Sequence, residues 1–311
     1  MGAVLTVLDK LMIMFMLLVT GYVCRKKQVL SNEFMDGISG FLTKIVIPCF
    51  MIDALQIDFT AQLFHDGMVV FVTCIIMHLM GFVVGLLSAK AFSLSKSAKG
   101  IWIFSCMFAN IGFMGVPVIA LIFGGNSVFY CAFASFAFNI TAYTLGVVIL
   151  NGCSEKEDKK AIDFAGLLKA PVNSMTILGL ILFVFRIKLP SFIGDSMEMV
   201  GSMLSPLAMM YVGTVLGKLS FKEAITEKWA YVLSVFRLVV MPLLAYLILK
   251  HFIHDTLILG VIIIGLSTPV GALCAIIAAE YDADVELASK YIFTTTVLCI
   301  FTMPMFFLLF L

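Results

Sequence analysis

Hydrophobic runs of membrane-spanning length recur along this chain, separated by short polar segments. A helix needs about 20 mostly apolar residues to cross the hydrocarbon core of a bilayer, and ten runs meet that requirement. They cover residues 4–24, 33–54, 67–91, 99–123, 127–150, 170–187, 193–217, 229–250, 256–279 and 287–310. The pattern predicts an all-α polytopic membrane protein with ten transmembrane helices.

The longest polar connection lies between the fifth and sixth runs and reads NGCSEKEDKKAIDF. It predicts a first five-helix repeat at residues 1–150, a cytoplasmic linker at 151–169 and a second five-helix repeat at 170–311. Because each half holds an odd number of helices, the second half must cross the membrane in the opposite direction. This is the arrangement of an inverted 5+5 repeat, which is common among secondary transporters.

The distribution of Lys and Arg predicts the orientation. Fourteen of them fall on one side: Arg25, Lys26, Lys27, Lys90, Lys96, Lys99, Lys156, Lys159, Lys160, Lys169, Lys218, Lys222, Lys228 and Lys290. Only Lys10, Arg186, Lys188 and Lys250 fall on the other. Since cytoplasmic loops carry the excess of basic residues, we expect the linker in the cytoplasm and both termini outside. The protein is then a multi-pass component of the cell (plasma or inner) membrane.

The first run has no basic region before it and no A-x-A-like cleavage site after it, so it predicts a retained helix rather than a secretory signal.

Composition agrees with the membrane interpretation and excludes several functions. The chain is 62% hydrophobic and 13% charged, whereas a soluble domain carries about 25% charged residues. The net charge of +1 gives no indication of a nucleic-acid partner. The eight cysteines stand singly, without metal-ligand spacing, so neither a metal site nor a disulfide framework is expected. No Walker-type, G-x-S-x-G or H-E-x-x-H motif is present, so we expect no catalytic residue, no cofactor and no enzymatic activity.

Two runs are interrupted near their midpoints, where broken backbone is costly. The residues at the interruptions are Asn110, Gly112, Gly115 and Pro117 in one run and Ser267, Thr268, Pro269 and Gly271 in the other. A lone Pro in a membrane helix is usually a tolerated kink. Two matched breaks instead leave polar backbone that protein, water or a ligand must satisfy. They predict that helices 4 and 9 are broken and cross at a polar cavity.

The chemistry expected at such a crossing favours an anion. Beyond each break a half-helix begins, around 116–119 and 270–273, and its first N–H groups carry the positive pole of the helix dipole. Two such ends that meet at the midplane form an anion site. The side chains of Asn110, Ser267 and Thr268 add hydrogen-bonding capacity. The eight residues at the breaks are therefore the predicted substrate-binding residues.

The element NIGFMGVP matches N-x-G-x-x-G-x-P and resembles the auxin efflux carrier family of plant auxin carriers and many bacterial carriers. The segment from Pro269, PVGALCAIIAAEYDADVELASKYIFTTTVLCIFTMP, is also similar, as are Lys44 four residues before Pro48 and the SPLAMMYVGTVLG of helix 7. The resemblance covers essentially the whole chain. It implies the inverted 5+5 fold with crossing broken helices, like that of sodium/proton antiporters and bile acid carriers.

The resemblance also implies function. It implies transport of organic anions, which are auxin-like acids in plants and dicarboxylates such as malate or malonate in bacteria. It implies that helices 1, 2, 6 and 7 form a panel that carries Lys44, and it implies a homodimer. The chain departs from the family pattern at two places: it has no Asn shortly after Pro269 and no carboxylate inside helix 3.

Four titratable residues within the runs are candidates for coupling or support of the site. A charge at the bilayer centre costs about 2.5–3.5 kcal/mol on insertion scales, so Lys44 either supports the anion or is paired or snorkels. His78 is a possible proton carrier or a neutral, hydrogen-bonded interior histidine. Asp53 is a coupling carboxylate or an interfacial charge. For Arg237, a role in substrate access and a role as a structural anchor are both open.

The sequence therefore predicts a secondary carrier of a small organic anion that works by alternating access, with membrane lipid around it. One alternative is a cation or proton exchanger of the same fold. It requires buried carboxylates, and none occurs at 101–120 or 257–279. A second is a non-transporting membrane sensor. A third is an intramembrane prenyltransferase that uses the acidic cluster at 280–286, but such enzymes need two acidic motifs.

Overall fold

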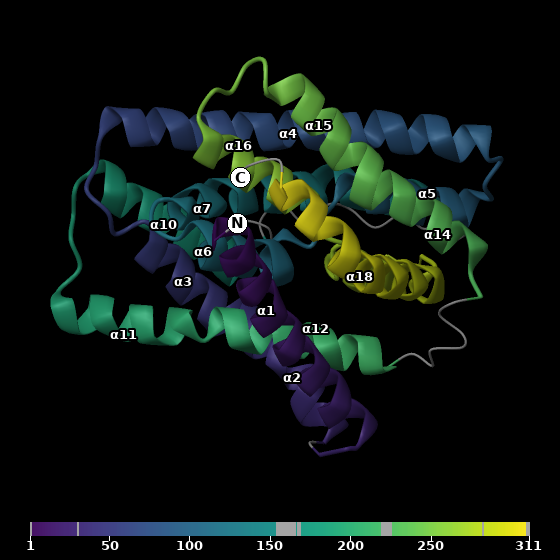
Figure 1. Ribbon diagram of the computed structural model, residues 1–311, viewed down its shortest axis with the longest axis horizontal. Helices are drawn as coiled ribbons and strands as arrows, with labels where there is room; N and C mark the ends of the chain where they lie inside the picture. The colour runs from purple at the N-terminus through teal and green to yellow at the C-terminus, as the bar shows by residue number, and fades with distance from the viewer. Residues whose placement is uncertain are drawn as a thin grey trace. The chain divides into compact units, whose positions relative to one another are not determined.

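The computed structural model describes residues 2–29, 31–153, 166, 169–218, 226–281 and 283–308 (Figure 1). Within these residues the chain is helical and has no strand; an isolated antiparallel bridge joins Ala109 and Val270. Six segments are long and apolar enough to cross a membrane: 37–54, 61–91, 127–153, 191–217, 228–249 and 285–307. The predicted all-helical membrane class is confirmed. Most of the predicted linker lies outside the described residues.

The other four predicted runs are helical as well, in different forms. Residues 4–24 lie within the 25-residue helix α1 (Gly2–Lys26). Residues 170–187 contain α10 (Pro171–Val184), which has 14 residues. Runs 99–123 and 256–279 are each divided by a non-helical stretch. Ten spans and an inverted repeat thus stay predictions, whereas the two interruptions are features of the structure.

Contacts divide the chain into two compact units. Unit 1 comprises Met1–Phe71, Gly112–Phe136 and Ala165–Lys218, and unit 2 comprises Val72–Ile111, Ala137–Phe164 and Leu219–Leu311. Each unit draws on both halves of the sequence. The boundaries fall inside α4 (Ala61–Ala91), inside α7 (Ser127–Thr141) and directly after Ile111.

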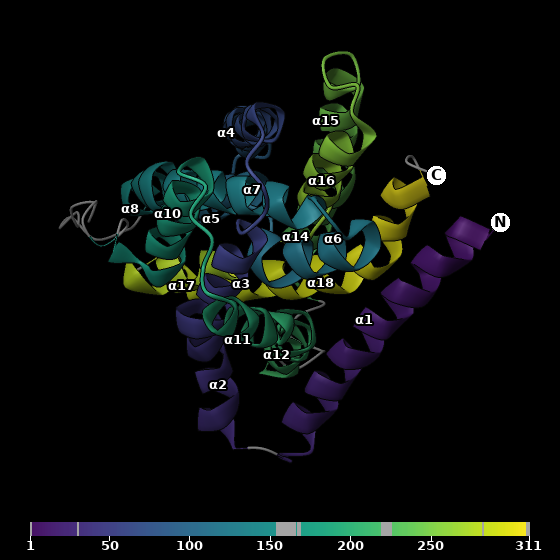
Figure 2. The same cartoon turned by 90° about the vertical axis from the view of Figure 1, so that its left-hand side faces the viewer.

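Unit 1 contains the predicted helices 1, 2, 6 and 7. Besides α1, α10 and parts of α4 and α7, its elements are α2 (Asn32–Phe41), the π-helical turn η1 (Leu42–Val46), α3 (Ile47–Ala54), most of η2 (Ile111–Gly115), α6 (Val116–Phe123), α11 (Ser191–Ser202) and α12 (Leu204–Lys218). Helices α1 and α12 lie side by side (Figures 1 and 2). They approach closely because glycines face the partner backbone: a Cβ at Gly213 would lie 1.9 Å from the Leu18 carbonyl oxygen.

Unit 2 contains the non-helical stretches of both broken helices. Besides parts of α4 and α7, its elements are α5 (Lys96–Met107), η3 (Ala142–Gly146), α8 (Val147–Cys153), α14 (Lys228–Val235), η4 (Phe236–Val240), α15 (Met241–Leu249), α16 (Thr256–Leu266), α17 (Leu273–Glu280) and α18 (Val285–Phe307). Its core is built around Trp102, which is fully buried and donates its indole N–H to the Ser88 hydroxyl at 2.9 Å.

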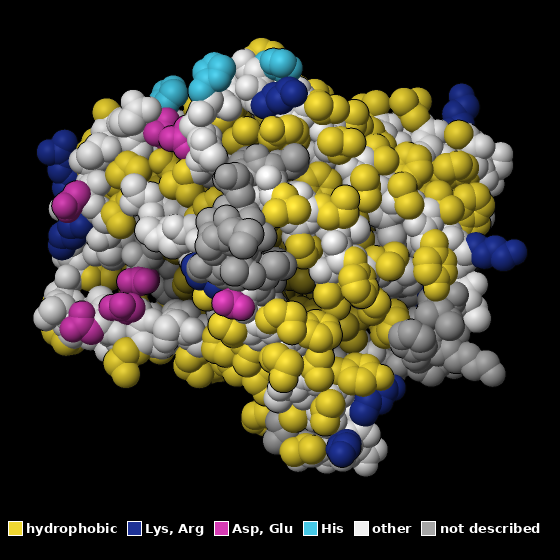
Figure 3. All heavy atoms as spheres, in the orientation of Figure 1, with side chains coloured by type: hydrophobic (Ala, Val, Ile, Leu, Met, Phe, Trp, Pro, Cys, Tyr) yellow, Lys and Arg dark blue, Asp and Glu magenta, His cyan; other side chains and the backbone are white. Residues whose placement is uncertain are grey.

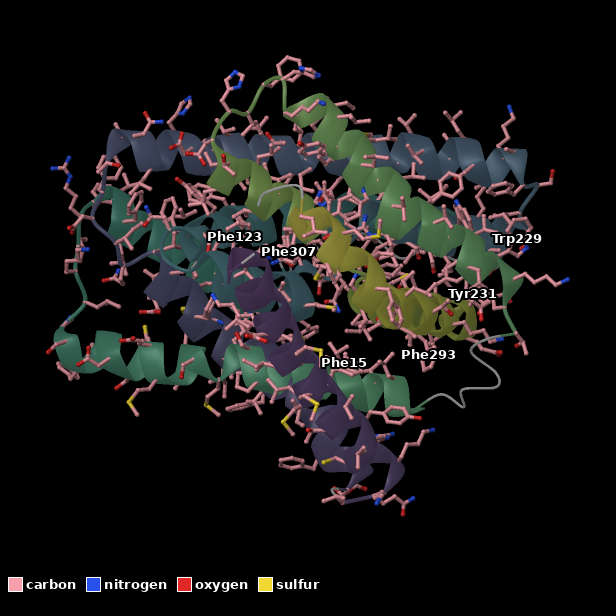
Figure 4. All side chains as sticks on the ribbon, viewed as in Figure 1. Phe15, Phe123, Trp229, Tyr231, Phe293 and Phe307 are labelled. Carbon is pink, nitrogen blue, oxygen red and sulfur yellow. The ribbon has the colours of Figure 1, made fainter. Side chains whose placement is uncertain are left out.

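Aromatic rings from several elements of unit 2 surround that indole. Trp102 packs edge-on against Trp229, Phe236 and Tyr291, with ring centroids 5.9–6.2 Å apart. Trp229 lies at the start of α14 (Figure 4). The cluster joins α5 to α14, η4 and α18, so the first half of helix 4 is held firmly within unit 2.

Large hydrophobic side chains are exposed on many of the helices, and they cover much of the face drawn in Figure 3. On α4, for example, Val83 and Leu87 are 52% and 62% exposed. Such surface is unfavourable in water and is satisfied by lipid hydrocarbon. It agrees with the membrane class that the hydrophobic runs predict.

Candidate functional site

The two non-helical stretches meet inside unit 2. Helix α5 ends at Met107 and α16 ends at Leu266, and the chain that follows each of them pairs with the other as a short antiparallel bridge. The Asn110 N–H donates to the Pro269 carbonyl oxygen at 2.8 Å, and the Gly271 N–H donates to the Phe108 carbonyl oxygen at 3.1 Å. Each break therefore supplies hydrogen-bond partners for some of the other's backbone N–H and C=O groups, as buried polar groups require.

Two further residues hold this crossing together. A Cβ at Gly271 would lie 3.1 Å from the Ala109 carbonyl oxygen, so the absence of a side chain allows the two backbones to approach. The Val270 N–H donates to the Thr295 hydroxyl of α18 at 3.1 Å. Sequence reasoning missed Thr295. The run Thr294–Thr295–Thr296 within a hydrophobic span was the available signal, because hydroxyls at that depth usually serve a partner.

The polar side chains at the crossing differ in what they can offer a ligand. Asn110 is 5% exposed, and its side-chain amide makes no hydrogen bond with any described residue. Ser267 and Thr268 are fully buried, and their hydroxyls donate to the Ile264 and Gly265 carbonyls of α16. Only Asn110 therefore retains a free side-chain donor. The two hydroxyl oxygens can act only as acceptors while those bonds persist.

Helix α17 begins at this crossing without a side-chain cap. The other helices that begin at loops of unit 2 are capped by Ser95, Glu227, Asp255 and Asp284. The N-cap of α17, Ala272, provides no such bond, and the N–H groups of Ala272 and Leu273 have no acceptor among the described residues. Uncapped N–H groups at the positive end of a helix dipole form a site for an anion.

The unwound part of helix 4 comes earlier than the sequence pattern indicated. Residues 108–110 are non-helical, whereas Gly112 and Gly115 lie in η2 and Pro117 is the second residue of α6. Pro is tolerated there because the first N–H groups of a helix need no intrahelical acceptor. These three residues belong to unit 1, and Asn110, Ser267, Thr268, Pro269 and Gly271 belong to unit 2.

His78 and Arg237 are both buried in unit 2. The His78 ring lies 2.8 Å from the Thr141 hydroxyl and packs against the rings of Phe108 and Phe138, at 5.1 and 6.2 Å. Arg237, on η4, is 0% exposed, and its Nη1 lies 3.5 Å from the Cys106 carbonyl oxygen, in the last turn of α5. The His78 ring thus contacts the first residue of the non-helical stretch of helix 4, and Arg237 contacts a carbonyl two residues before that stretch.

Lys44 and Asp53 belong to unit 1, whereas the crossing belongs to unit 2. Lys44 lies on η1 with an exposed side chain, and Asp53 is half-buried near the end of α3. A cavity of about 380 Å³ lies beyond that end of α3, between residues 55–59 and 182–188. In its lining, Lys188 pairs with Asp58 at 3.0 Å and donates to the Gln56 carbonyl oxygen. The side-chain Nε2 of Gln56 is buried without a hydrogen-bond partner among the described residues. The cavity contains none of the predicted site residues.

Comparison with known proteins identifies the family. A model of the family described as membrane transport protein matches residues 6–307. The chain belongs to this family, the auxin efflux carriers. The resemblance carried by NIGFMGVP and its companion segments is therefore confirmed.

Two archaeal relatives extend the match to individual proteins. An uncharacterized transporter of Methanocaldococcus jannaschii is 24% identical over 296 residues, which cover 93% of this chain and 94% of the relative. An uncharacterized transporter of Methanothermobacter thermautotrophicus is 26% identical over 311 residues, which cover 98% and 97%. The similarity spans both units. The protein is thus a multi-pass member of a membrane transporter family.

Proposed function

We propose that this auxin efflux carrier family member is a secondary carrier of a small organic anion, and that the crossing in unit 2 binds the anion. One observation supports this most strongly: the uncapped start of α17 lies beside Asn110, whose side-chain amide makes no hydrogen bond with the part of the chain that the structure describes. Backbone N–H groups, a helix dipole and an amide donor are together suited to a carboxylate. The ligand would supply the acceptors that these groups lack.

The chemistry of the crossing favours an anion over a cation. A cation exchanger needs carboxylates there, but the sequence has none at 101–120 or 257–279. Arg237, a buried guanidinium, contacts the end of α5 and would repel a cation. The family resemblance points to auxin-like acids or to dicarboxylates such as malate and malonate. The missing second Asn leaves one side-chain amide for this role.

Transport by alternating access requires two bodies that change their relative position around the bound substrate. We propose that units 1 and 2 are these bodies, within ten spans that form an inverted 5+5 repeat. Lys44, on unit 1, would then respond to binding through its charge. The resemblance to plant carriers further supports a homodimer in the cell membrane.

Asn110→Ala tests the binding role. We expect the affinity for the bound carboxylate to fall about tenfold or more, because a hydrogen bond to a charged group is lost. Carboxylic acids are first screened by thermal shift, since a ligand that binds the folded state raises its melting temperature. Affinity and counterflow of the labelled acid are then measured in proteoliposomes.

Asn126→Ala is the matched control, because Asn126 is an exposed amide in the turn before α7. It should leave affinity and counterflow unchanged. Unchanged binding and uptake by Asn110→Ala would remove Asn110 from the site. Binding without any counterflow would favour the sensor over the carrier.

A further inference from the structure

Arg237 is a buried charge whose hydrogen-bonding needs are mostly unmet. Its side chain is 0% exposed, and its Nε and Nη2 atoms have no partner among the described residues. The remaining nitrogen, Nη1, reaches the Cys106 carbonyl oxygen at 3.5 Å. A buried guanidinium without a counter-charge is strongly unfavourable, and such an orphaned group requires an explanation.

The surroundings in unit 2 provide little negative charge. The Cys106 carbonyl belongs to the last turn of α5, so Arg237 faces the negative end of that helix dipole, which amounts to about half a charge. The other polar groups in electrostatic range, His78 and the Cys106 thiol, carry no carboxylate. Tyr291 adds another buried donor without an acceptor, its hydroxyl. The described part of unit 2 thus has an excess of buried donors near the end of α5.

This excess lies close to the crossing. Cys106 is two residues before Phe108, whose carbonyl accepts the Gly271 N–H at 3.1 Å. Two residues of chain span at most about 7 Å, so Nη1 of Arg237 lies within about 14 Å of the Gly271 nitrogen. At an effective dielectric constant of about 20, a charge at that distance changes the affinity for one negative charge about sevenfold.

We propose that Arg237 determines the charge preference of the site and makes it favour dicarboxylates over monocarboxylates. The inference rests on the proposed function, which already includes dicarboxylates among the candidate substrates, and adds to it the residue that sets the preference between one and two negative charges. The α17 start and Asn110 suffice to orient one carboxylate. The guanidinium adds an attraction that acts on every negative charge of the ligand, so that a dianion gains it twice.

The test is the binding of matched acids to the full-length protein in nanodiscs, with succinate compared with butyrate and phthalate with benzoate. In at least one pair, we expect the wild-type protein to bind the dicarboxylate more tightly. Arg237→Met should lower the affinity for the dicarboxylate about fiftyfold and the affinity for the monocarboxylate about sevenfold, because the Coulomb interaction scales with ligand charge. Arg237→Lys keeps the charge and should keep most of the preference.

Arg186→Met is the matched control, since it removes an exposed guanidinium that lies 5.2 Å from the Phe59 ring in unit 1. It should leave the ratio of the two affinities unchanged. If Arg237 has only a general structural role, Arg237→Met should lower the affinities for both acids by the same factor. That result overturns the inference and leaves the proposed anion site intact. A wild-type protein without charge preference overturns it even if Arg237→Met does not fold. If the wild type binds none of the four acids, both the proposed function and the inference fail.

Discussion

Asn110 contributes its backbone and its side chain to different tasks. The N–H fixes the crossing through Pro269, and the side-chain amide has no hydrogen-bond partner among the described residues. Thr295 illustrates the complementary case, because its hydroxyl is entirely committed: it donates to the Tyr291 carbonyl at 2.7 Å and accepts from Val270 at 3.1 Å. The Asn110 backbone thus supports the crossing, as the Thr295 hydroxyl does, and the Asn110 side-chain amide is the group that the proposed ligand would engage.

Thr295→Val should destabilise the crossing, because it leaves the buried Val270 N–H without an acceptor. The free energy of unfolding should fall by about 1–3 kcal/mol, which is measured as a lower apparent melting temperature in detergent. Thr296→Val is the control, since the Thr296 hydroxyl only donates to the Ile292 carbonyl within its own helix. Equal losses in the two variants would show that Val270 does not depend on Thr295.

At the scale of the element, proline placement explains three of the four π-helical turns in the described part of the chain; no proline follows η3 within α8. Pro48, Pro117 and Pro242 each stand two residues after the end of such a turn, in η1, η2 and η4. Proline lacks an N–H and its ring clashes with the carbonyl four residues earlier, and a wider turn accommodates both effects. Lys44 and Arg237, the two basic residues that the charge distribution assigns to neither side of the membrane, lie on η1 and η4.

The packing of α1 on α12 makes a separate prediction. Gly213→Ala places a Cβ 1.9 Å from the Leu18 carbonyl oxygen, where no side-chain movement can relieve the overlap. We expect the free energy of unfolding to fall by about 1–3 kcal/mol or more, measured by thermal unfolding of the purified protein. Gly194→Ala on α11 meets nothing within 4 Å and should be neutral or slightly stabilising. A Gly213→Ala protein as stable as the wild type would contradict this packing.

At the scale of the whole molecule, the two units do not follow the two halves of the sequence. The predicted helices 1, 2, 6 and 7 all belong to unit 1, and the non-helical stretches of both broken helices belong to unit 2. An inverted repeat supplies each body with elements from both halves. This division supports the proposal that one unit carries the crossing while the other moves relative to it.

The orientation in the membrane can be measured directly. In a background without the native cysteines, we expect Lys188→Cys to react with a membrane-impermeant maleimide on intact cells. Lys96→Cys should react only after permeabilisation, because the excess of basic residues places its loop in the cytoplasm. Labelling both variants in permeabilised cells controls for reactivity. The reverse pattern would place both termini inside.

The sequence by itself determined the membrane class, the existence of two interrupted helices and the family. These follow from local properties, namely runs of apolar residues and clusters of Gly, Pro and Asn, and from a motif that is read in order along the chain. The position of the break was less well predicted, since Gly112, Gly115 and Pro117 are helical. Gly and Pro permit the chain to leave the helical conformation but do not require it to do so.

Only the tertiary structure decided which residues leave the helical conformation and what they contact. Residues 108–110 are non-helical because the chain after α16 supplies hydrogen-bond partners some 160 residues away in sequence. Arg237 is buried against the end of α5, and Thr295 lies beside Val270, for the same reason. Pairings between distant segments depend on how the helices pack, and no local pattern encodes them.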